Sequence, residues 1–177
     1  MEYLTGYEAL VGWAGWAGGL VGTGEHILLR AGEADVRQSR AVLRRALALR
    51  EAMYHLLAPG ARSSGVREAL DILNSEIQTA GRRSAVRFNE RGYVLGWTAG
   101  EELDQVLWPV ARSAAELMTS ADLARVRECD GHNCGWLFID TSKAGRRRWC
   151  SMAICGNRAK SERYRQRGAP APSREGR

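Results

Sequence analysis

Four cysteines near the C-terminus are the residues of this chain best suited to chemistry. They form two equal pairs, Cys129-x4-Cys134 and Cys150-x4-Cys155, separated by fifteen residues, and no cysteine occurs in the first 128 residues. Two local turns can bring four thiolates to the corners of a tetrahedron, as a structural zinc site requires, with no position left for a substrate water. The spacing predicts Zn²⁺ bound by Cys129, Cys134, Cys150 and Cys155.

Two other roles for the cysteines stay open. Two disulfides would use the same residues, and unrelated buried thiols are a third interpretation. The start of the chain, with Glu2 and Thr5, does not resemble a basic and then apolar export signal, and disulfides are rare in a reducing cytoplasm. No apolar run approaches the roughly 18 residues of a membrane span. We therefore prefer zinc and expect a cytoplasmic protein. His132 could replace a thiolate, but we expect it to face solvent.

Positive charge is concentrated in the same part of the chain. The formal net charge is +6, yet residues 1–126 are close to neutral and the excess follows them. Clustered arginine and lysine create a local field that favours phosphate, so this segment is expected to bind nucleic acid. A solvated basic helix, or one that docks on an acidic partner, is the alternative. The expected contact residues are Lys143, Arg146, Arg147, Arg148, Arg158, Lys160, Arg163, Arg165 and Arg167.

The residues between and after the cysteines predict a small treble-clef-like finger. Residues 135–140 are typical of a short strand, 141–145 of a turn and 146–149 of a returning strand. Ser151 can then cap a helix that contains Cys155 in its first turns and continues to residue 167. We expect the aromatic residues of this segment to form the core of the finger, with stacking on RNA bases as the alternative: Trp136, Phe138, Trp149 and Tyr164.

Upstream of the finger, the hydrophobic periodicity predicts a helical domain. Apolar residues at steps of three, four or seven predict helices over 33–57, 66–77 and 101–118. Gly81 is expected to end the second helix, and Pro109 to bend the third.

Two further elements complete this domain. A short helix within 1–19 is expected to pack through Trp13 and Trp16, and the glycine-rich run 18–24 is better explained as a turn than as a phosphate loop. Alternating residues over 85–97 predict a β-hairpin. The fold class is therefore α+β, mainly α, with a helical N-terminal domain and β-hairpin followed by the zinc finger. The predicted domain limits are 1–126 and 127–167, with a disordered tail at 168–177.

The sequence around the cysteines resembles the CGNR zinc finger. The four-residue motif that names this family is present as Cys155-Gly156-Asn157-Arg158, after Arg147-Arg148-Trp149-Cys150. Upstream, the segment from Trp108 to Ser120 resembles the end of the ABATE domain, which accompanies this finger in bacterial proteins. The resemblance implies a stress-related transcription regulator, with zinc in the finger and a ligand-binding N-terminal domain.

Charge and resemblance together predict a zinc-dependent, DNA-binding transcriptional regulator. In this hypothesis the finger contacts DNA, and the N-terminal domain senses a signal or assembles subunits. DNA is the expected partner; a homodimer, a small-molecule effector and the transcription machinery are open, and no membrane partner is expected. The alternatives are a protein-interaction module that docks its basic finger on an acidic partner, and RNA binding. We expect no enzyme, because the three histidines are scattered and no nucleophile elbow or HExxH pattern occurs.

Overall fold

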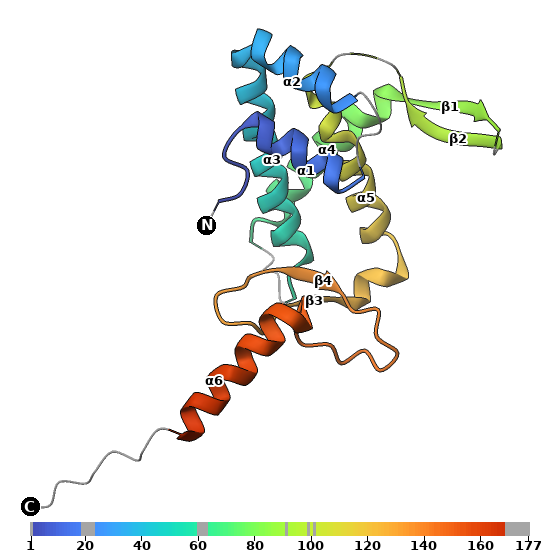
Figure 1. Ribbon diagram of the computed structural model, residues 1–177. Coiled ribbons are helices and arrows are strands. Elements are labelled where there is room, and N and C mark those ends of the chain that lie inside the picture. The colour runs from blue at the N-terminus through green and yellow to red at the C-terminus, as the bar shows by residue number, and fades with distance from the viewer. Residues whose placement is uncertain are drawn as a thin grey trace, which may run out of the picture. The chain divides into compact units, whose positions relative to one another are not determined.

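The chain forms two compact units (Figure 1). The computed structural model describes residues 2–18, 24–59, 64–90, 92–98, 100 and 102–168, and the side chains up to residue 165. The N-terminal unit comprises residues 1–57 and 61–120, and the C-terminal unit comprises 121–177 with the short segment 58–60. Helices dominate and two small antiparallel sheets accompany them, which confirms the predicted α+β, mainly helical class. The predicted tail beyond residue 168 lies outside the described residues.

The N-terminal unit contains five α-helices, a short 3₁₀ helix and one hairpin within the described residues. They are α1 (Tyr7–Trp16), α2 (Gly24–Ala34), α3 (Val36–Leu57), α4 (Val66–Arg83), β1 (Ser84–Asn89), β2 (Gly92–Trp97), η1 (Leu103–Val106) and α5 (Trp108–Met118). No helix in the described part of the chain combines the length and apolar character that crossing a membrane requires.

Helix α3 is the centre of this unit, because it contributes to both hydrophobic clusters. Its Val42 and Ala46 pack in a cluster with α1, α2 and η1, and its Leu49 packs with α4 and α5. The sequence placed a single helix over 33–57, but the helix breaks at Asp35. The Asp35 carboxylate accepts a hydrogen bond from the backbone N–H of Gln38 at 2.8 Å, so it caps the N-terminus of α3 and separates it from α2.

Helix α1 packs through a different face from the one expected. Its buried residues are Tyr7, Leu10, Val11 and Ala14, whereas the predicted anchors Trp13 and Trp16 are exposed. The hydroxyl of Tyr7 donates to the carbonyl of Leu103 at 2.8 Å. A buried hydroxyl must find an acceptor, and this bond ties α1 to η1.

Two helix limits also differ from the sequence prediction. Gly81 does not end α4, which continues to Arg83, because a glycine inside a helix lowers its stability without stopping it. Pro109 does not bend a long helix, because it lies in the first turn of α5, where a proline needs no backbone N–H. The preceding residues form the separate helix η1.

A buried charge network connects three elements of the N-terminal unit. Arg45 of α3 forms ion pairs with Glu76 of α4 at 2.7 Å and with Asp104 of η1 at 3.0 Å. Glu76 is buried, and two nitrogens of the guanidinium engage both of its carboxylate oxygens. Burying a carboxylate is costly without such pairing, so Arg45 makes the approach of α3 and α4 possible.

The hairpin has the predicted position. Strands β1 and β2 are antiparallel, with Val86 opposite Leu95 and Phe88 opposite Tyr93. Trp97 at its base lies against the buried Trp108, with ring centroids 5.9 Å apart.

The C-terminal unit contains a second, smaller hairpin and one long helix. Its elements are η2 (Ala121–Arg125), β3 (Val126–Glu128), β4 (Leu137–Ile139), the π-helical turn η3 (Met152–Gly156) and α6 (Asn157–Gly168). β4 pairs with β3, not with residues 146–149, which form no strand. The predicted returning strand is therefore wrong. The side chains of Arg147 and Arg148 bond to the rest of the finger, while β3 pairs with the edge of β4.

Candidate metal centre

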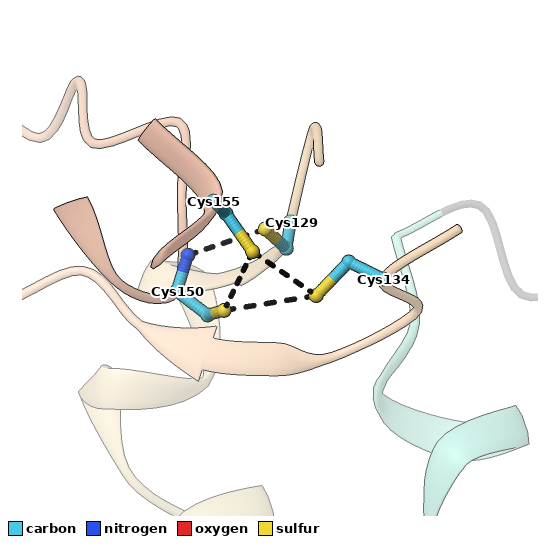
Figure 2. Close-up of side chains that lie close together, drawn as sticks. All are labelled: Cys129, Cys134, Cys150 and Cys155. Carbon is cyan, nitrogen blue, oxygen red and sulfur yellow. Dashed lines mark hydrogen bonds between the residues drawn. The ribbon is translucent and has the colours of Figure 1, made fainter. Parts of the chain in front are cut away.

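The structure brings the four cysteines together, although fifteen residues separate the two pairs (Figure 2). Their sulfur atoms all lie within 4.8 Å of one another. Cys134 and Cys150 are 3.7 Å apart, Cys150 and Cys155 are 3.7 Å apart, and Cys134 and Cys155 are 3.6 Å apart, each measured between Sγ atoms.

These distances fit tetrahedral zinc. A tetrahedron with Zn–S bonds of about 2.3 Å has edges of about 3.8 Å, close to the three sulfur separations. A disulfide needs sulfurs about 2.0 Å apart, and all four cysteines are free thiols. The donor set is therefore the four-thiolate set of a structural zinc site. His132 is exposed and is not part of the cluster.

A tight turn places the first two ligands. The backbone N–H of Cys134 bonds to the carbonyl of Gly131 at 3.0 Å, which closes the turn between Cys129 and Cys134. Gly131 faces the centre closely: a Cβ there would lie 3.1 Å from the Sγ of Cys155 and 3.3 Å from that of Cys129. The sequence did not point to Gly131, because the need for a residue without a Cβ at this position arises only where the two cysteine pairs meet in the folded chain.

Ser151 places the fourth ligand, as predicted. Its hydroxyl accepts a hydrogen bond from the N–H of Ile154 at 3.3 Å, and its carbonyl accepts one from the N–H of Cys155 at 3.0 Å. This cap starts the π-helical turn that carries Cys155 and leads into α6. The ligand and the basic helix are thus parts of one continuous helical segment.

The surroundings of three thiols shift their pKa values in different directions. Burial raises the pKa of Cys129, but the N–H groups of Cys150 and Gly131 donate to its sulfur and lower that pKa to about 7. Burial and the neighbouring thiols raise the pKa of Cys150 to about 12. The hydrogen bond to Cys134, followed by burial, raises the pKa of Cys155. Crowded thiols resist ionisation together, and a divalent cation relieves that repulsion.

A buried carboxylate organises the loop between β4 and Cys150. Asp140 is buried and accepts hydrogen bonds from the N–H and hydroxyl of Ser142 at 2.9 and 2.6 Å and from the N–H of Arg147 at 2.9 Å. The Ser142 hydroxyl bond is the main cause that lowers the pKa of Asp140. The sequence interpretation missed this role, although an Asp two residues before a Ser is a recognised turn signal.

Two of the predicted nucleic-acid contacts are engaged within the finger. Arg147 donates to the carbonyls of Trp149, at 2.8 Å, and Cys150. Arg148 forms an ion pair with Asp130 at 2.7 Å, and its guanidinium lies over the ring of Trp149. Arg147 in particular has its donors committed to the backbone beside a zinc ligand. Its first role in this structure is to hold the finger together.

The other predicted cations remain exposed. No carboxylate among the described residues forms an ion pair with any of them, and Arg163 and Arg165 donate hydrogen bonds to carbonyls of their own helix. The side chain of Arg167 lies outside the described residues. These exposed cations are Lys143, Arg146, Arg158, Lys160, Arg163 and Arg165.

The expected aromatic core of the finger is only partly present. Phe138 and Trp149 are half-buried, but Trp136 is 60% and Tyr164 82% exposed. The helix that carries Tyr164 extends beyond the small hairpin, and no other described element of this unit lies along its far turns (Figure 1). In a unit of this size the metal replaces much of the missing core.

The fold and the cluster define a modular zinc-finger protein, with a helical unit followed by a four-cysteine finger. Two family models match the chain: "CGNR zinc finger" over residues 125–168, and ABATE, "Putative stress-induced transcription regulator", over residues 1–121. The chain belongs to the ABATE family and carries a CGNR zinc finger, with Zn²⁺ as its metal. This agrees with the resemblance in the sequence. No similarity to a curated protein was found.

Proposed function

We propose that this chain is a transcription regulator whose zinc finger binds duplex DNA. The observation that carries the proposal is the exposed basic surface of α6, which continues directly from the zinc ligand Cys155. A helix without partners on most of its surface can enter a groove or lie along the phosphates. The description of the ABATE family as transcription regulators supports the same function.

Zinc has a structural role in this proposal. Four thiolates fill its coordination sphere, so no position is open for a water or substrate. The metal fixes the orientation of α6 relative to the loop that carries Lys143 and Arg146 in the same unit. We therefore propose no catalytic activity for the metal site. The N-terminal unit would sense a signal or assemble subunits.

The exposed cations set the expected strength of the salt dependence. Six side chains that neutralise up to six phosphates would give a slope of about −5 when the logarithm of the DNA-binding constant is plotted against the logarithm of the salt concentration. Arg147 and Arg148 would contribute less, because each already has an internal partner.

Fluorescence anisotropy of labelled duplex DNA with the zinc-loaded chain tests the proposal. The double variant Lys160→Ala/Arg163→Ala should weaken binding and reduce the magnitude of the salt slope by about 2. The matched control, Arg37→Ala/Arg40→Ala, removes the same charge from exposed positions of α3 and should leave DNA affinity unchanged. No binding to any duplex at low salt, or equal losses in both variants, would reject DNA contact through α6.

One observation favours a second candidate, contact with a protein. Trp136 and Ile154 are exposed on the finger, and a protein partner would cover such apolar side chains in its interface. In that case an acidic partner would bind the basic finger, and the substitutions Trp136→Ser and Ile154→Ser would abolish binding while DNA affinity stayed the same.

A further inference from the structure

The hairpin β1–β2 is firmly attached at its base and extends away from the helices of the N-terminal unit (Figure 1). Trp97 lies against the buried Trp108, and the N–H of Thr98 donates to the carbonyl of Arg83 at 2.7 Å. Arg83 also forms an ion pair with Glu102 at 2.7 Å. The hairpin is therefore a fixed projection with two exposed faces.

One face of this projection is apolar. Residues directly opposite each other in an antiparallel pair have side chains on the same face. The pairs Val86–Leu95 and Phe88–Tyr93 thus share a face, and their exposures are 70, 50, 74 and 81%. The rings of Phe88 and Tyr93 meet edge to face, with centroids 5.2 Å apart. We call these four residues the hairpin face.

The one charged residue of the two strands starts from the other side of the hairpin. Arg87 is opposite Val94 in the register, so its side chain starts from the face opposite Phe88 and Tyr93. Its guanidinium donates to the carbonyl of Trp97. No charged residue of β1 or β2 shares the hairpin face. Nucleic acid and acidic partners need cations at their contact surface, so the hairpin face suits neither of them.

We infer that the hairpin face binds the hairpin face of a second copy of this chain. Contact between two identical uncharged faces buries no unpaired charge, and a two-fold arrangement places the same residues on both sides. A two-stranded hairpin by itself is of marginal stability in water, and a packed partner would add a second layer to this projecting one. Pairing face to face is the common solution for sheets, about 10 Å apart.

The size of the surface sets the strength of this dimer. Four large apolar side chains expose a few hundred Å², which is a patch size that often marks an interaction site. A standard interface buries about 800 Å² on each partner, so the hairpin face alone gives a weak dimer that depends on concentration. The dimer needs no DNA, so it is tested separately from the proposed function.

Sedimentation equilibrium of the full zinc-loaded chain, over a micromolar concentration series without DNA, tests the inference. We expect a monomer–dimer equilibrium that Phe88→Ser/Tyr93→Ser weakens at least about tenfold. Val94→Ser is the matched control, because it removes an apolar side chain from the opposite face of the same strand and should leave the equilibrium unchanged. Trp16→Ser removes an aromatic side chain that is 85% exposed on α1 and should also have no effect.

Folding of the variants is checked by circular dichroism. If the double serine variant fails to fold, Val86→Thr/Leu95→Thr takes its place. Threonine is β-branched like Val86 and favours strands more than Leu95 does, so this variant keeps the strands and still removes apolar surface from the hairpin face. A chain that stays monomeric at the highest concentration would overturn the inference. So would a dimer that responds equally to Val94→Ser, or one that no substitution in the hairpin face weakens.

Discussion

The guanidinium of Arg147 lies over the ring of Phe138, with its central carbon 4.9 Å from the ring centroid. The same group bonds to the carbonyls of Trp149 and Cys150, so it connects β4 to the segment that delivers the third cysteine. Arg146, the preceding residue, is exposed like Arg147, but no such hydrogen bond or ring contact holds its guanidinium among the described residues. Two adjacent arginines thus have different surroundings, although the sequence makes them look equivalent.

Substitution should separate these two arginines. Arg147→Ala removes hydrogen bonds and a cation–π contact, so we expect it to destabilise the finger by about 1 kcal/mol, or roughly a fivefold loss in apparent zinc affinity. Arg146→Ala should leave zinc affinity unchanged and reduce the magnitude of the DNA salt slope by about 0.9. Competition with a chromogenic chelator measures the first effect and anisotropy the second. Equal zinc affinities in both variants would show that Arg147 does not hold the finger.

Metal removal should unfold the finger and spare the N-terminal unit. Zinc binding and folding are one equilibrium in such modules, whereas the N-terminal unit has its own hydrophobic clusters. Chelation, or Cys150→Ser, should therefore abolish DNA retention while most of the far-UV helical signal persists. Adding zinc back should restore binding to the chelated protein but not to the variant. DNA binding that survives loss of the metal would contradict the structural role of zinc.

Zinc uptake should release protons in a pH-dependent manner. The metal-free finger is unfolded, so its thiols have the ordinary pKa of about 8.5 and are mostly protonated at pH 8, where zinc displaces about three protons. At pH 6 an unfolded thiol is almost fully protonated, and the release rises to nearly four protons. Because protons compete with zinc, affinity falls as pH falls. A pH indicator in weak buffer measures the release, and a release well below three protons would show that four thiolates do not bind the metal.

The buried charge network predicts a non-additive effect on stability. Arg45→Ala leaves the buried carboxylate of Glu76 without a partner, so we expect a loss of about 3 kcal/mol in the free energy of unfolding. Adding Glu76→Gln should recover part of that loss, because it removes the unpaired charge. Urea unfolding followed by circular dichroism gives both values. Simple addition of the two single-variant losses would show that the residues do not interact energetically.

Local signals in the sequence were enough to predict the metal site and most of the elements. The spacing of the four cysteines predicted a zinc tetrahedron because each pair is joined by a local turn, and the cap at Ser151 acts within four residues. The alternation over 85–97 likewise predicted the hairpin, since strand pairing across a short turn is decided by neighbouring residues. The concentration of positive charge after residue 126 follows from the sequence alone.

Tertiary packing decided which residues of each element are buried and which cations are free. In α3 the buried residues include the small Ser39, Ala46 and Ala52, because α3 packs against helices on two sides and small residues allow close approach. Arg147 differs from Arg146 only because Phe138 and the carbonyls near Cys150 come within its reach. Such contacts join residues whose proximity depends on the folded chain, and no local pattern encodes them.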